Sequence, residues 1–72
     1  MSISRLIGRV QVFAQHCYET YDIETLEAAL TQPVANVADC SAWGITPDEW
    51  FIAVAVALNE RLTERQAEEG AS

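Results

Sequence analysis

The sequence predicts an all-α fold, a compact bundle of three or four helices in which the last, from about Pro47 to Gln66, is longest and central. Apolar residues near the N-terminus recur at three- and four-residue steps, and a strong helix-start signal lies at residues 46–49. A chain of 72 residues has room for at most one hydrophobic core. We therefore expect one helical domain over residues 1–66 and a frayed tail over residues 67–72.

The first helix is expected from Ser2 or Ser4 to about Tyr18. Gly8 lies inside this range and would weaken a helix by up to about 1 kcal/mol relative to alanine, unless a close helix crossing needs the space. Gly8 is therefore a candidate contact between helices. The predicted buried stripe consists of Ile3, Leu6, Ile7, Val10, Phe13, Ala14 and Cys17.

Asp22, Pro33 and Gly44 divide the middle of the chain into two candidate helices. Asp22 can cap a second helix over about residues 23–31, which Pro33 would end because its ring clashes with the preceding turn. Between Pro33 and Gly44 we favour a short helix, since proline suits a first helical turn and glycine suits the residue just past a helix end. An ordered loop is the alternative.

The sequence Thr46-Pro47-Asp48-Glu49 predicts the start of the last helix. Threonine as the cap, proline at the first helical position and glutamate three residues after the cap form a capping box. Residues 52–58 alternate between larger apolar residues and alanine, a pattern that a β-strand would also show. We favour the helix, because the capping box precedes this run and residues 59–66 continue in helical composition.

The charge of the chain restricts its partners. Four basic residues face eleven acidic ones, for a net charge of −7. Nucleic-acid and anionic membrane surfaces are recognised mainly through Lys and Arg, so we expect no direct nucleic-acid binding and no membrane binding. The longest apolar run, Trp50 to Leu58, has nine residues, short of the roughly 20 that a membrane-spanning helix needs. A basic protein surface is the natural complement.

The chain shows no pattern typical of an enzyme, a metal site or a cofactor site. His16 and Cys17 are adjacent, but neighbours on a helix point about 100° apart, which is poor geometry for a thiol nucleophile. Cys17 and Cys40 lack the short paired spacings of a zinc site, and no glycine-rich phosphate loop is present. We therefore expect no enzyme activity, metal or cofactor. With no signal peptide in the sequence, we expect free thiols and a cytoplasmic location.

Acidic and aromatic residues are the candidates for partner binding. The acids near residues 19–27 are either a solvated face or a patch that docks an arginine-rich partner. The tryptophans belong to the core by default, but one could anchor an interface. The first half of the last helix is apolar on all sides. We expect the stripe of Phe51, Ala55, Leu58 and Leu62 to pack inward, which leaves a second face for a partner. The candidate residues are Glu19, Asp22, Glu24, Glu27, Trp43, Trp50, Ile52 and Val56.

These observations favour a small acidic protein-protein interaction module, an adaptor or inhibitor that docks on a basic or apolar surface of a larger assembly. Small acidic phage or mobile-element proteins that block host machinery are similar in composition alone. A homodimer is also expected, because so short a chain has little volume in which to bury its apolar residues. The alternatives are a transcription or nucleoid modulator acting through a protein partner and, third, a small enzyme or carrier.

A short stretch of the chain resembles the Hha-type nucleoid modulators. The resemblance covers the five residues Ile23-Glu24-Thr25-Leu26-Glu27, followed by a capped apolar helix, and the overall length. The segment between these two features is longer here than in that family. The net negative charge of the chain also differs from that of a DNA-associated protein. The resemblance implies the nucleoid-modulator alternative and does not establish membership of that family.

Overall fold

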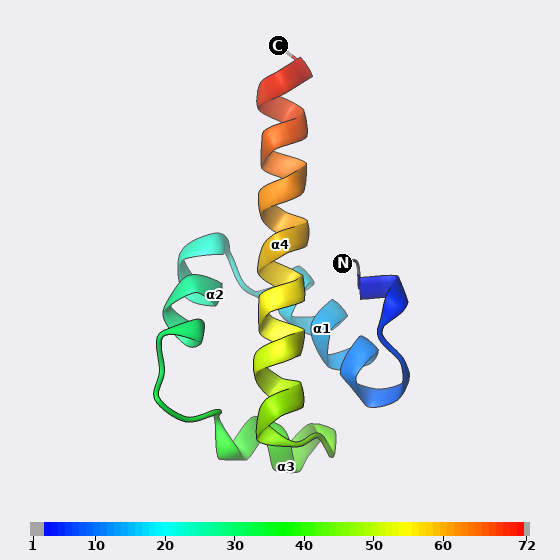
Figure 1. Cartoon of the computed structure of the whole chain (residues 1–72), viewed down its shortest axis with the longest axis vertical. Helices are drawn as coiled ribbons and strands as arrows, with labels where there is room; N and C mark the ends of the chain where they lie inside the picture. The colour runs from blue at the N-terminus through cyan, green and yellow to red at the C-terminus, as the bar shows by residue number, and fades with distance from the viewer. Residues whose placement is uncertain (1–2, 72) are drawn as a thin grey trace.

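The computed structural model describes residues 3–71, which form an all-α protein, as predicted (Figure 1). The longest helix, α4, contacts all the others, and its C-terminal part projects beyond them, so the molecule measures 42 × 24 × 17 Å. Ser2, one predicted helix start, and Ser72, the end of the predicted tail, lie outside the described residues. The elements are a 3-10 helix, η1 (Ile3–Arg5), and the α-helices α1 (Gly8–Thr20), α2 (Ile23–Leu30), α3 (Val37–Trp43) and α4 (Pro47–Ala71).

The first helix starts later than expected, at Gly8. The residues before it form η1 and an extended link, and Gly8 has a φ of 61°, which L side chains rarely adopt. A Cβ atom at Gly8 would meet nothing within 4 Å, so the expectation that Gly8 is a helix packing contact is wrong. Because Ile7 precedes the helix, it leaves the predicted stripe and is 84% exposed.

Side-chain caps set the starts of α2 and α3. Asp22 Oδ1 accepts a hydrogen bond from the Thr25 backbone N–H at 2.9 Å, as the predicted cap of α2. The favoured short helix between Pro33 and Gly44 is confirmed, but it begins at Val37, where Asn36 accepts from the Asp39 N–H at 3.2 Å. Gly44 ends it in the left-handed conformation, with a φ of 64°.

Both hydrogen bonds of the predicted capping box are present at the start of α4. The Glu49 N–H donates to Thr46 Oγ1 at 3.2 Å, and the Thr46 N–H donates to Glu49 Oε1 at 2.9 Å. The helix continues past the expected end at Gln66 to Ala71. Alanine and glutamate, which favour helix, make up this extension except for Gly70. Fraying of this end stays a prediction.

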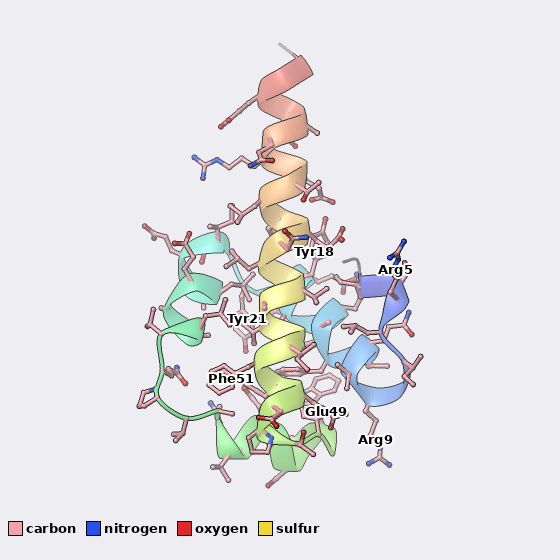
Figure 2. The ribbon with its side chains drawn as sticks, viewed as in Figure 1. Arg5, Arg9, Tyr18, Tyr21, Glu49 and Phe51 are labelled. Carbon is pink, nitrogen blue, oxygen red and sulfur yellow. The ribbon has the colours of Figure 1, made fainter. Side chains whose placement is uncertain are left out.

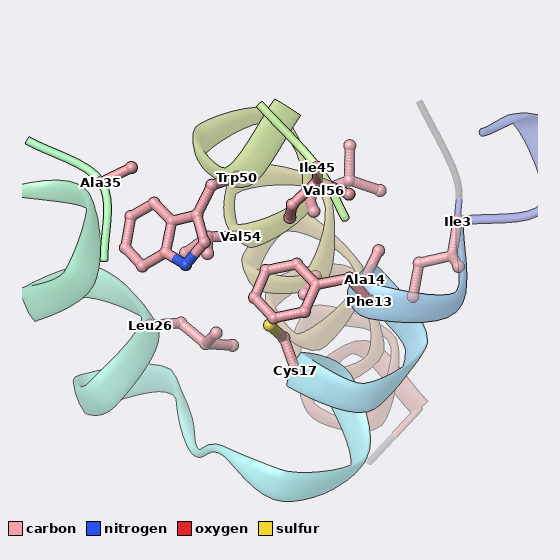
Figure 3. Close-up of a cluster of buried hydrophobic side chains, with 12 residues drawn as sticks. Ile3, Phe13, Ala14, Cys17, Leu26, Ala35, Ile45, Trp50, Val54 and Val56 are labelled. Carbon is pink, nitrogen blue, oxygen red and sulfur yellow. The ribbon is translucent and has the colours of Figure 1, made fainter. Parts of the chain in front are cut away.

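The core lies where α1 crosses α4, with α2 covering one side (Figure 3). Ala14 on α1 and Ala53 and Ala57 on α4 are fully buried, and side chains this small allow two helices to approach closely. Phe13 and Leu26 are the largest of the fully buried side chains. The remaining core residues are Ile3, Cys17, Ala35, Ile45, Trp50, Val54 and Val56.

Candidate functional site

The solvent-facing side of α4 carries a strip of residues that we call the outer face, comprising Ile52, Ala55, Asn59 and Leu62. All four are exposed, with Ile52 at 45% and Leu62 at 37%, and they follow one another at steps of three, four and three residues. Steps of this size place side chains in one line along a helix. α4 therefore presents a continuous strip that is apolar except for Asn59.

The predicted division of α4 into two faces is partly wrong. Val56 is only 4% exposed and belongs to the core, so the expectation that it is left free for a partner does not hold. Ala55 and Leu62, which were expected to pack inward, lie on the outer face with Ile52. The alanine-rich side of α4 is buried instead, because α1 packs against it through Ala14.

Phe51 and Leu58 border the outer face on one side. Both are half-buried and pack against the core, so each also presents an apolar edge to solvent. Phe51 points toward the side of α4 on which α2 lies (Figure 2). These two side chains widen the apolar strip of the outer face.

An acidic groove runs between the start of α2 and the C-terminal half of α4. Its carboxylates outnumber its guanidinium groups by four to two. Both arginines are engaged: Arg61 lies over the Tyr18 ring at 4.8 Å, and Arg65 pairs with Glu69 at 3.5 Å. The groove is therefore net negative. Its lining residues are Asp22, Ile23, Glu24, Arg61, Glu64, Arg65 and Glu68.

The other predicted partner-binding residues are dispersed. Glu19 and Trp43 share a shallow hollow on α1, where the Trp43 ring lies 4.9 Å from the His16 ring and 5.4 Å from that of Phe13. Glu27 is exposed on α2 and lines neither this hollow nor the acidic groove. Trp50 is 3% exposed and packs in the core. Of the acids near residues 19–27, Asp22 and Glu24 line the acidic groove together, while Glu19 and Glu27 lie outside it.

A cavity of about 260 Å³ lies between the four α-helices, and the sequence did not predict it. Asp39 lies on its wall, and its Oδ2 accepts a hydrogen bond from Trp50 Nε1 at 3.2 Å. Nothing in the sequence distinguishes Asp39 from the other acidic residues of the chain. The other lining residues are Phe13, Cys17, Tyr21, Thr25, Leu26, Ala28, Ala29, Gln32, Asn36 and Val54.

Two of the side chains that line this cavity, Cys17 and Tyr21, have raised pKa values. Burial, and secondly the charge of Asp39, raise the pKa of the Cys17 thiol to about 12. Burial, followed by the charges of Asp39 and Cys17, also raises the pKa of Tyr21. A thiol that stays protonated at neutral pH is a poor nucleophile.

Within residues 3–71, no cluster of three or more histidine, cysteine, aspartate or glutamate side chains is placed to hold a metal ion. No helix in this part of the chain is both long and apolar enough to cross a membrane. Comparisons with protein-family models, curated proteins and solved structures found no match to this chain.

Proposed function

We propose that this protein is a small protein-protein interaction module, an adaptor or inhibitor, that docks through the outer face of α4 onto a larger assembly. The observation that carries the proposal is the line of exposed apolar side chains Ile52, Ala55 and Leu62 along one helix. Contiguous exposed apolar surface on a folded chain typically marks an interaction site. A helix that presents such a strip is a common unit of protein recognition.

Charge indicates the kind of surface that α4 would meet. The helix contains six acidic residues and two arginines, and the acidic groove beside it is also net negative. A partner surface that is apolar in the middle and bordered by Lys and Arg would complement both the outer face and the acidic groove. Opposite potentials speed the encounter of two proteins and reject wrong partners. The proposed partner therefore presents an apolar surface with basic edges.

A second copy of this chain is the other candidate for the outer face. The steps between Ile52, Ala55, Asn59 and Leu62 are those of a two-stranded coiled coil, in which apolar residues recur roughly every 3.5 residues. Each chain carries a net charge of −7, however, and two such chains repel one another. Charge therefore favours the basic partner over the homodimer.

The proposal is tested by photocrosslinking in cells, with p-benzoylphenylalanine placed at residue 55 of the full chain. The control carries the same group at residue 12, where an exposed valine lies on α1. We expect position 55, and not position 12, to capture a protein with a basic surface. Equal capture at both positions, or none at position 55, would contradict the proposal, and capture of a second copy would replace the basic partner with the homodimer.

The captured protein is then purified and its affinity measured. Ile52→Glu should raise the Kd at least about tenfold, because it places a charge in the apolar strip. Val37→Glu is the matched control, since Val37 is an exposed valine on α3 outside the outer face, and should leave the Kd nearly unchanged. The Kd of the unaltered pair should rise with salt. Unaltered affinity in Ile52→Glu would exclude the outer face as the docking surface.

A further inference from the structure

The cavity between the four α-helices is a second candidate binding site, and it is separate from the outer face. Buried apolar side chains, Phe13, Leu26 and Val54, form much of its wall, and the Trp50 indole lies beside them (Figure 3). Its volume of about 260 Å³ is close to the lower end of the range for small-molecule sites. An aromatic or short aliphatic group would fit it, but a nucleotide-sized ligand would not.

Charge in the cavity comes from a single side chain. Among the lining residues, Asp39 alone carries a formal charge at neutral pH, and no arginine or lysine lines the wall. Asp39 forms no ion pair within the described part of the chain, and its Oδ2 is held by Trp50 Nε1. The charge of Asp39 also affects other side chains that line the cavity, since it helps to raise the pKa of both Cys17 and Tyr21. The cavity is therefore apolar with one negative wall.

We propose that this cavity binds a small organic cation, a protonated amine or a guanidinium carried on an apolar body. The cation would pair with the Asp39 carboxylate at the half-buried wall, where a charge pair is screened less than on the open surface. The apolar body would pack against Phe13 and Trp50, whose ring faces also attract cations. An anion would be repelled, and a neutral molecule would leave the Asp39 charge without an opposite charge.

Nuclear magnetic resonance of the full chain, labelled with ¹⁵N, tests the proposal through the indole N–H of Trp50. The probes are 2-phenylethylamine and its neutral counterpart 2-phenylethanol, which differ in the charged group. We expect 2-phenylethylamine to shift the Trp50 signal saturably, with a Kd on the order of 1 mM, and 2-phenylethanol to bind at least about tenfold more weakly. The indole signal of Trp43, which does not line the cavity, is the internal reference.

Asp39→Asn removes the charge and keeps an oxygen that can accept from Trp50, so the two probes should bind this variant equally. Asp48→Asn makes the same change in the first turn of α4, away from the cavity, and should retain the preference for the amine. The proposal is overturned if neither probe shifts Trp50, if the alcohol binds as tightly as the amine, or if Asp39→Asn keeps the preference.

A third probe, the capped peptide acetyl-Gly-Arg-Gly-amide, separates a free ligand from an arginine side chain of a partner protein. Tighter binding of the peptide than of n-butylguanidine, which carries one guanidinium on a free aliphatic chain, supports an arginine of a partner as the cation. Tighter binding of n-butylguanidine supports a free small molecule. Both results require the Asp39 charge, and failure of both probes to compete with 2-phenylethylamine would contradict a guanidinium ligand. None of these outcomes depends on the outer face of α4.

Discussion

The indole N–H of Trp50 donates to Oδ2 of Asp39 at 3.2 Å and so connects the first turn of α4 to the first turn of α3. Trp50 is 3% exposed, so without Asp39 its N–H would be buried with no partner. This contact holds α3 beneath the start of α4, next to the cavity wall.

Trp50→Phe should lower the free energy of unfolding by about 1–3 kcal/mol, because it removes this hydrogen bond and part of a buried ring. Urea denaturation monitored by circular dichroism would measure the loss. Trp43→Phe is the matched control, since Trp43 is only half-buried, and should cost less. Equal losses in the two variants would show that the contact with Asp39 adds nothing.

Thr46→Ala should cost about 1 kcal/mol, the usual effect of losing a helix cap, because the Glu49 N–H loses its acceptor. Thr63→Ala makes the same change at an exposed position inside α4, where alanine favours helix, and should cost nothing. The two variants are compared by thermal unfolding. If they melt together, the capping box does not stabilise the start of α4.

Val56→Glu should unfold the protein, because it places an unpaired charge in the core at a cost of several kcal/mol. Ile52→Glu, one helical turn away on the outer face, should change stability by no more than about 0.5 kcal/mol. The helical signal in circular dichroism distinguishes the two variants. A folded Val56→Glu protein would place that residue at the surface, contrary to its burial in the core.

Stability should fall above pH 9. The folded state raises the pKa of Cys17 from 9.0 to about 12, so the unfolded chain releases this proton at lower pH than the folded protein does. The stabilising contribution is therefore complete below pH 9 and is lost as the pH rises from 9 toward 12, at no more than about 1.4 kcal/mol per pH unit for one group.

Urea denaturation of the unaltered protein and of Cys17→Ala, from pH 7 to pH 11, measures this dependence. The alanine variant is less stable at pH 7 but should lose stability less steeply above pH 9. Some slope should remain, because the pKa values of Tyr18 and Tyr21 are raised as well, that of Tyr18 chiefly by its hydrogen bond to Glu64. Parallel curves would exclude Cys17 as a source of the alkaline instability.

The local signals in the sequence predicted the helices and most of their ends. Asp22, Thr46 and Gly44 cap helices through contacts with backbone groups only a few residues away in the sequence. Their roles as caps can therefore be predicted from the local sequence alone. The start of α1 was missed because the apolar spacing continues through Gly8, although the backbone at Gly8 turns into the left-handed region. Spacing alone does not report that turn.

Tertiary packing decided which side of α4 is buried and where the cavity lies. The first half of α4 is apolar on all sides, so helical periodicity shows that a core exists but does not select the face that forms it. The choice depends on how closely α1 can approach, and Ala14 allows that approach at Ala53 and Ala57, which leaves Ile52 outside. The cavity joins Asp39 to Phe13 and Leu26, which are distant in the sequence and meet only once the helices have packed. The sequence by itself therefore determined the helices and their caps, while the surfaces available to a partner or ligand depend on contacts between distant segments.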